Sequence, residues 1–600
     1  MLNCAVNFNS GDIGNMKRFL FIWALLTSLV SAGGCASIGA ESGNKVLAQV
    51  DDAATGTLQN RPAIVELNGK PAILYAAKDD RVALQIGGQR QLLDETARVR
   101  GGNHFQLHRQ DQNLQALWWS HDDGKNIYFT SSADEGKSFN AVSMVNDEHG
   151  VLPPYSLTQG PQGVVGVTYQ DERATGYQAY FNRSTDNGRS WARPDQRLDT
   201  PPKGRTSDVH EAQSVQSGTV WVSAWTDNTP GTGQASYRIV SRRSVDEGQS
   251  WSAPEVLYSA DHQISSLMIR AQSGNMVIAA DELNRGIIAL GSQDEGRSWR
   301  SAGVLAGTEG ASNSGIDMAV TGGRAHLVWM QDRKDEKTHI MRASLDVAQS
   351  KWLGAVQRLD LKSHENTRST SPVILATPQG SVLASWVDFR DIRPNVYLSS
   401  SSDQGQAWSA PQALLKPGEV SAGWPQLLPW RDQVAIGYEL YPTDRPADGK
   451  FVVRLLEAAD SAKGLAGLPA PAALSEADRK ARLEQRVKTM WDQRVAGNYE
   501  PTYDMFDFAY KAATPKKYYV DSVGVITYLS YAVGDMAIAG NEASVKMKLR
   551  YEVKPTVLPS TGKKITLPAA DVESPTTWVW VANDWYMVYS PSFEPPQLKY

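Results

Sequence analysis

Charged side chains follow short apolar segments throughout the middle of this chain. Arginine can hold a carboxylate through two parallel hydrogen bonds, so it suits a site that must grip an anionic group. Sugars need such bidentate polar partners together with flat aromatic surfaces. The residue types therefore indicate a glycan site. The candidate ligand-binding residues are Arg173, Glu172, Arg285, Arg333, Arg390, Trp225 and Trp386.

The aspartates in the same segments have a second interpretation. Asp171, Asp227 and Asp388 each end an apolar run. An aspartate at that point can cap a hairpin by bonding to its backbone. Because the position repeats along the chain, we favour this structural role for the aspartates. The less regular arginines and glutamates remain the better ligand candidates.

Three histidines occupy near-equivalent positions, 17 to 19 residues before the aspartate of their segment. They are His104, His210 and His262. Converging imidazoles could bind a metal ion. We instead interpret them as solvated or hydrogen-bonded histidines, and we expect neither a metal nor a cofactor. The chain has only two cysteines, Cys4 and Cys35, which excludes a disulfide framework and a cysteine-based metal site.

An eight-residue motif, Ser-x-Asp-x-Gly-x-x-Trp, recurs along the chain and marks the turns between the strands that must position these residues. Ser and Asp side chains can bond to the backbone of a tight turn, Gly supplies a positive φ, and the Trp is buried. A worn copy spans Ser344–Trp352. Five good copies are centred on Asp134, Asp186, Asp246, Asp294 and Asp403, for which we predict a structural role.

The motif is identified as the Asp-box, or BNR, repeat, and residues 55–457 resemble the sialidase superfamily of β-propellers. The resemblance implies four-stranded blades and a glycoside hydrolase with a tyrosine nucleophile, a glutamate and an acid/base aspartate. Arg61-Pro62 only partly matches the family's Arg-Ile-Pro motif, so the catalytic set cannot be transferred residue by residue. If the protein is an enzyme, the candidate catalytic residues are Glu211, Glu282, Tyr169 and Asp281.

The number of units exceeds the number of boxes. Units without a box lie at residues 71–88 and 433–458, which gives a total of eight, with seven as the main alternative. The family has six blades. The last unit lacks a fourth strand, which the apolar stretch at 45–50 could supply and so close the ring. In a propeller the box turns lie on one face, so we place the ligand site on the opposite rim.

The N-terminal residues 1–35 read as a signal peptide with a lipobox, with the true start at Met16. The apolar run at 19–30 is too short to span a bilayer. Small residues before Cys35 resemble the site at which bacteria attach lipid, which implies anchoring, in the outer membrane of a Gram-negative bacterium. Cleavage without lipid is the alternative. Residues 36–54 form a tether and the closing strand.

A second domain follows a linker at 458–474 that is rich in Ala, Gly and Pro. Ser475 is expected to cap a helix, with Leu483, Val487, Met490 and Trp491 on its apolar face. Residues 475–600 resemble the α+β cone fold of nuclear transport factor 2. We expect this domain to bind or dimerise rather than to catalyse.

Three functions remain open. The chain could be an envelope-anchored protein that recognises glycans or other extracytoplasmic ligands, a sialidase-type hydrolase that removes terminal sugars, or a scaffold for envelope assembly. The expected partners are a glycan or protein ligand and the membrane. The net charge of −5 gives no reason to expect nucleic acid.

Overall fold

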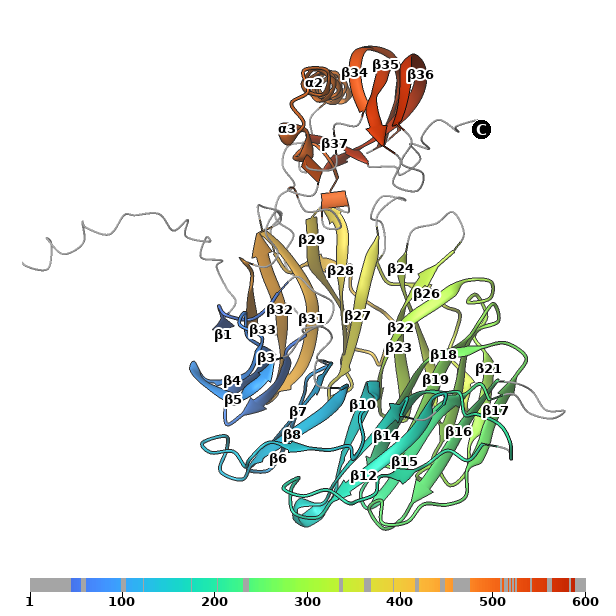
Figure 1. Ribbon diagram of the computed structural model, residues 1–600. Helices are drawn as coiled ribbons and strands as arrows, with labels where there is room; N and C mark the ends of the chain where they lie inside the picture. The colour runs from blue at the N-terminus through green and yellow to red at the C-terminus, as the bar shows by residue number, and fades with distance from the viewer. Residues whose placement is uncertain are drawn as a thin grey trace, which may run out of the picture. The chain divides into compact units, whose positions relative to one another are not determined.

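The computed structural model describes the greater part of the 600 residues, and Figure 1 shows their arrangement. The described residues are 45–55, 61–98, 104–121, 124–173, 175–201, 203–229, 237–333, 338–360, 368–391, 393–415, 420–442, 448–456, 475–507, 510–511, 516, 519–520, 523, 526–539, 542–557, 564–581 and 584–588. Cys35 and the linker at 458–474 lie outside them. The described part is mainly β.

Among the described residues, eight antiparallel sheets lie before the helix that begins at Glu476, and their strands pair in chain order except that β1 joins the last sheet. The first four sheets contain β2 Ala63–Leu67, β3 Lys70–Ala76, β4 Arg81–Ile86 and β5 Gln89–Arg98; β6 Gln106–Gln110, β7 Asn113–Ser120, β8 Asn126–Ser132 and β9 Ser143–Met144; β10 Val151–Gln159, β11 Val165–Asp171, β12 Gln178–Ser184 and β13 Gln196–Arg197; and β14 Val209–Ser217, β15 Val220–Asp227, β16 Tyr237–Ser244 and β17 Glu255–Ala260. A 3-10 turn, η1 Pro161–Gly163, joins β10 to β11.

The next four sheets follow the same plan. They contain β18 Ile264–Gln272, β19 Asn275–Glu282, β20 Gly286–Ser292 and β21 Arg300–Val304; β22 Ser312–Thr321, β23 Arg324–Asp332, β24 His339–Asp346, β25 Lys351–Trp352 and β26 Gln357–Arg358; β27 Ser369–Ala376, β28 Val382–Asp391, β29 Arg393–Ser401 and β30 Gln412–Ala413; and β31 Val420–Trp430, β32 Gln433–Pro442, β33 Lys450–Leu456 and β1 Val46–Val50. The stretch at 45–50 therefore supplies the fourth strand of the last sheet, because β1 pairs with β33.

The first strands of the eight sheets follow one another in a closed circuit. β2 contacts both β6 and β31, and β10, β14, β18, β22, β27 and β31 contact one another in that order. Gln106 of β6 completes the circuit by donating to the carbonyl oxygen of Tyr155 in β10 at 2.6 Å. Apolar clusters fill the space between neighbouring sheets. Middle strands such as β20 are consequently buried along their whole length, as expected for strands covered on both faces.

Strand register defines the two ends of each sheet. In the third sheet, Val151 at the start of β10 lies opposite Asp171, and Val165 lies opposite the box residue Ser184. The first strands thus begin beside the charged segments, and the boxes lie at the other end. We call these ends the loop face and the box face. This arrangement agrees with the one expected from the sequence.

Each box is a turn held by its aspartate. Asp134 accepts hydrogen bonds from the Ser132 hydroxyl at 2.7 Å and from the Ser138 amide at 2.9 Å. The Ser138 hydroxyl donates to its second oxygen at 2.6 Å. The same bonds recur around Asp186, Asp246 and Asp294, and Asp403 bonds to Ser401 and to the Ala407 amide. Gly136 has φ +79° and lies against Ile86, where a side chain would not fit.

A β-bulge interrupts six of the first strands near the loop face. The register shifts in β10, β14, β18, β22, β27 and β31. In five of these strands the first bulge residue is left-handed: Glu211, Ser266, Gly315, Ser371 and Trp424. A bulge redirects side chains and bends the strand. These residues therefore lie where the wall of the circuit changes direction.

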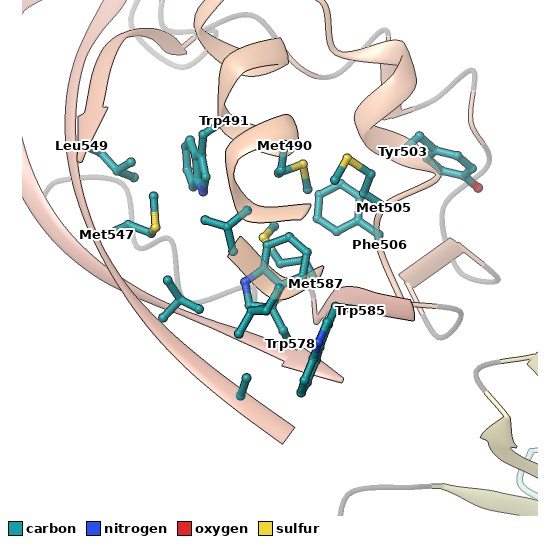
Figure 2. Close-up of a cluster of buried hydrophobic side chains, with 14 of the residues drawn as sticks. Met490, Trp491, Tyr503, Met505, Phe506, Met547, Leu549, Trp578, Trp585 and Met587 are labelled. Atoms are coloured by element: carbon teal, nitrogen blue, oxygen red, sulfur yellow. The ribbon is translucent and has the colours of Figure 1, made fainter. Parts of the chain in front are cut away.

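The described residues beyond the linker form a helix packed on a curved sheet. The elements are α2 Glu476–Val495, α3 Glu500–Tyr503, β34 Ile526–Ala539, β35 Glu542–Val557, β36 Lys564–Val581 and β37 Asp584–Val588, with the strands paired in that order. Ser475 caps α2 through the Asp478 amide, and the predicted face of Leu483, Val487, Met490 and Trp491 is buried. Figure 2 shows this helix packing on the tryptophans of β36 and β37.

No helix among the described residues is both long enough and apolar enough to cross a membrane.

Candidate functional site

A cavity of about 960 Å³ lies within the circuit of first strands, toward the loop face. Its wall combines apolar groups with polar ones, and it draws on seven of the eight sheets. The lining residues are Arg61, Pro62, Ala63, Ile64, His104, Phe105, Gln106, Leu107, His108, Pro154, Tyr155, Ser156, Leu157, Gln213, Ser214, Met268, Arg270, Val373, Pro425 and Gln426. Strands far apart in the chain thus share one concave surface.

Two guanidinium groups give the cavity its charge. Arg61 lies with its guanidinium carbon 4.7 Å from the centroid of the Trp424 ring, and its Nε has no hydrogen-bond partner among the described residues. Burial lowers the pKa of Arg61, while the charges of Glu439 and Asp317 raise it. Arg270 reaches Asp317 at 3.3 Å. The described lining residues thus include two arginines and no carboxylate, while Asp317 and Glu439 lie near the two guanidinium groups without lining the cavity.

Three glutamines tie neighbouring first strands together around the cavity. The side-chain amides of Gln106, Gln213 and Gln426 donate to backbone carbonyl oxygens of the next sheet, at 2.6, 2.7 and 2.5 Å. Their acceptors are Tyr155, Leu267 and Pro62. His108 lies close to Gln106, and burial lowers the pKa of His108 to about 4. This imidazole is therefore neutral at neutral pH and can both donate and accept.

Arg173, the first of the predicted ligand-binding residues, forms ion pairs with other side chains of the protein. Its side chain is 8% exposed and lies 2.8 Å from Asp171 and 2.8 Å from Asp195. A third carboxylate, Asp147, also contacts it, and its guanidinium stacks on Tyr180. The prediction that Arg173 binds a ligand is not supported, because all its charge is neutralised internally.

Its neighbours Glu172 and Tyr169 are likewise occupied. Glu172 pairs with Lys125. Tyr169 is fully buried, and its hydroxyl donates to Asp195 at 2.5 Å. Burial raises the pKa of this hydroxyl well above its usual value. A nucleophile would need contact with the sugar and a lowered pKa, so the geometry argues against Tyr169 as one.

Arg390 and Trp386 repeat this arrangement in the seventh sheet. The guanidinium of Arg390 donates to Asp388 at 2.6 Å and stacks on Tyr397. Trp386 is buried, and its indole nitrogen donates to Asp388 at 3.1 Å. Both side chains are therefore engaged with Asp388 in this structure, and their role in sugar binding stays a prediction. The structural interpretation of the segment aspartates is consistent with these contacts.

The remaining predicted ligand residues do not line the cavity either. Arg333 donates to the carbonyl oxygens of Gly307 and Glu309 at 2.7 and 3.2 Å. Trp225 is 1% exposed within a core cluster and offers no ring to a sugar. Arg285 is exposed beyond the end of β19. The structure does not bring these three residues together.

Glu211, a predicted catalytic residue, accepts hydrogen bonds from backbone amides. One of its oxygens accepts the amide of Ser266 at 2.9 Å and the other accepts that of Leu267 at 2.6 Å, both in the next first strand. Burial raises the pKa of Glu211, and these two hydrogen bonds lower it. Each oxygen accepts one backbone amide of the next sheet, so Glu211 holds two sheets together.

Glu282 and Asp281 are also buried and bonded. Glu282 accepts the hydroxyl of Tyr258 at 2.7 Å and lies 3.5 Å from His262. Asp281 accepts the amide of Asn313 at 2.9 Å. The four predicted catalytic residues therefore lie in separate contacts around sheets three to six, and the described geometry does not join them into one site.

The histidines have separate partners too. His210 lies 2.8 Å from Asp208, His262 lies near Glu282, and His104 lines the cavity. Among the described residues, no group of three His, Cys, Asp or Glu side chains could hold a metal ion.

Sequence reasoning missed most of the cavity wall. Arg270, Gln213 and Gln426 were not singled out, and Arg61 entered only as part of a motif comparison. One signal was present: Gln213 and Gln426 both lie two residues beyond a left-handed bulge residue. That signal becomes readable only once the bulges are known.

Comparisons with known proteins agree with the fold class. Residues 163–361 match the BNR repeat-like domain, and no curated protein matches the chain. Among solved structures, an ulvan lyase is 9% identical over 69% of this chain and 96% of its own, with a TM-score of 0.42. A sialidase from Streptococcus pneumoniae is 9% identical over 69% and 92%, with a TM-score of 0.31. A protein of unknown function from Dyadobacter fermentans is 13% identical over 52% and 97%, with a TM-score of 0.32.

The chain is thus a mainly β protein with a BNR repeat-like region. Its structural neighbours are sialidase, arabinanase and lyase β-propellers.

Proposed function

We propose that this protein is an eight-bladed propeller that binds the acidic end of a glycan in the cavity on its loop face. The eight sheets are the blades, and their first strands surround the ligand. One observation carries the proposal: Arg61 and Arg270 both line a cavity whose described wall has no carboxylate. A sugar carboxylate or sulfate would meet guanidinium groups there, and its ring would meet Met268, Val373 and the prolines.

The test measures the affinity of the chain from residue 36 onward by calorimetry. The probes are sialyllactose, a glucuronic-acid oligosaccharide and neutral lactose. We expect an acidic probe to bind and Arg61→Ala and Arg270→Ala each to weaken it by about tenfold or more, since a charge-assisted hydrogen bond contributes about 1.5–3 kcal/mol. Arg189→Ala is the matched control, because Arg189 lies on the box face and bonds to Asn140.

Three outcomes would contradict the proposal. Equal affinity for lactose and the acidic probes would remove the role of charge. Release of a fluorophore from aryl sialosides, abolished by Glu211→Gln or Glu282→Gln, would favour the hydrolase instead. A chain that binds no glycan but captures envelope proteins would favour the scaffold.

The proposal includes a place in the cell. Lipid on Cys35 would anchor the protein in the outer membrane of a Gram-negative bacterium, with the propeller outside the cytoplasm. Palmitate labelling that persists after Cys35→Ala would contradict this.

The C-terminal domain is proposed to be a nuclear transport factor 2-like module that docks or dimerises. The cone fold is supported by the packing of α2 on the curved sheet. The outward face of that sheet carries the ion pairs Lys548–Glu573, Arg550–Asp571 and Lys546–Asp535. This polar face suits a solvated or transient contact. Sedimentation that shows a monomer at all concentrations would exclude dimerisation.

A further inference from the structure

Trp424 occupies the bulge of β31 that corresponds to Glu211 in β14. Both are left-handed, and both precede a glutamine that ties the strand to the next sheet. Glu211 reaches forward to the next sheet and caps the amides of Ser266 and Leu267. Trp424 also reaches forward, because the sheet after β31 is that of β2, and Arg61 stands directly before β2. In the last sheet this position therefore contacts a charged side chain instead of backbone amides.

The backbone at Trp424 is in a conformation that a bulky residue rarely adopts. Its φ is +51°. The left-handed region is disfavoured for a residue with a large side chain, and glycine enters it at little cost. The equivalent residue of β22 is Gly315, with φ +61°. Strained residues of this kind persist where the surrounding structure holds them, and they concentrate at functional sites. The contact that the Trp424 indole makes with a neighbouring side chain compensates for this backbone strain.

That contact is with Arg61. The guanidinium lies over the indole face at 4.7 Å from its centroid, and Arg61 lines the cavity. An arginine stacked on an aromatic ring keeps its hydrogen-bond donors in the plane of the guanidinium and available to a ligand. The Arg61 Nε has no partner among the described residues. The indole thus fixes the plane of the group without using its donors.

We propose that Trp424 is a positioning residue that presents the Arg61 guanidinium to an anionic ligand in the cavity. The inference rests on the proposed function, because it assigns Trp424 a task in binding the acidic end of a glycan. Trp424 itself is not among the residues that line the cavity.

The experiment is a double-mutant cycle in the chain from residue 36 onward, with sialyllactose and a glucuronic-acid oligosaccharide as probes. Loss of a cation–π contact should weaken binding of an acidic probe about fivefold to tenfold in both Trp424→Gly and Trp424→Leu. Trp424→Phe keeps an aromatic face and should stay within about twofold of the parent. In the Arg61→Ala background, Trp424→Gly should change affinity by less than about twofold, since the group it positions is gone.

The matched control is Trp408→Leu. Trp408 stacks with Arg342, whose guanidinium lies 5.2 Å from its ring, but it belongs to a box on the opposite face. The Trp408→Leu substitution should leave the affinity for the acidic probes unchanged. Trp424→Leu keeps apolar bulk, so it tests the idea even if the glycine variant does not fold.

The outcomes separate this inference from the function on which it rests. Arg61→Ala without effect on acidic probes would contradict the proposed function. Arg61→Ala with a large effect, but Trp424→Leu without one, would overturn the role of Trp424 alone. Equal losses for Trp424→Gly with and without Arg61 would also overturn it, since the indole would then act independently of Arg61.

Discussion

Arg173 lies among three carboxylates that come from three separate segments of the chain. Asp171 and Asp195 are fully buried, and Asp147 is 15% exposed. Burial raises the pKa of Asp195 to about 6, and burial also raises that of Asp171. Removal of the one buried cation would leave three carboxylates to repel each other in a poorly solvated space.

Arg173→Ala should therefore lower the free energy of unfolding by about 3–5 kcal/mol at pH 7.5. A carboxyl group whose pKa is raised in the folded state stabilises the fold when it is protonated, so its unfavourable effect disappears as pH falls from about 6 toward 4. The difference in melting temperature between variant and parent should narrow at pH 5, as measured by calorimetry.

Arg193→Ala is the control for this prediction. Arg193 lies 3.5 Å from the same Asp195, but its side chain is 44% exposed. The cost should stay below about 1 kcal/mol. A pH-independent loss in Arg173→Ala would mean that packing, rather than charge, dominates at this position.

At this scale the sequence revealed which residues were unusual but not their contacts. The sequence distinguishes Arg173 and Arg390 from the regular segment aspartates and predicts that they bind a ligand, but it does not show which groups they contact. Their partners Asp147 and Asp360 precede the next sheet by a loop, and only the fold brings them near. Arg61 and Arg270 line one cavity for the same reason.

The box turn is the element that could be predicted most fully from sequence. The hydrogen bonds that its Ser and Asp side chains make within the turn join residues two and four positions apart, so residue types and spacing determine them. The bulges of the first strands are the opposite case. They depend on how neighbouring sheets meet, and a Glu, a Ser, a Gly and a Trp can all occupy the same position. No periodicity in a single strand reveals them.

Asp134→Asn should lower the melting temperature by a few degrees at pH 7. Hydrogen bonds from the Ser138 hydroxyl and amide and from the Ser132 hydroxyl lower the pKa of Asp134 to about 2. Stability from an ionised group of this kind is present above the unfolded pKa of about 4 and is lost as pH falls through about 2. The difference between variant and parent should thus vanish in acid, as followed by circular dichroism.

Glu135→Gln makes the same change in charge one residue along the same turn. The Glu135 carboxylate makes none of the hydrogen bonds that hold the turn. The melting temperature of Glu135→Gln should therefore match that of the parent. An equal loss in both variants would trace the effect to net charge instead.

The molecule as a whole depends on β1. This strand is the only part of its sheet that precedes the circuit in the chain, and Val50 and Ala53 lie in the core between the first and last sheets. By pairing with β33, β1 closes the circuit of sheets and covers a strand edge that would otherwise stay unpaired. Such closure could be expected from the missing fourth strand of the last unit, although its register could not.

A chain that begins at Asp51 should consequently melt several degrees below one that begins at Lys45. Its β33 edge would be exposed to pairing with other molecules, so light scattering on heating should begin earlier. Identical melting curves would show that β1 contributes little to the closed circuit.

The pairing of β1 with β33 also joins two segments that are synthesised at different times. Lys450 donates to Gln49 across a sequence separation of 401 residues. Synthesis at about 5–20 residues per second places roughly 20–80 s between the appearance of the two partners. Throughout that interval the apolar segment Val46–Val50 has no strand to join. This segment of a nascent chain must therefore be kept from premature association until β33 has been made.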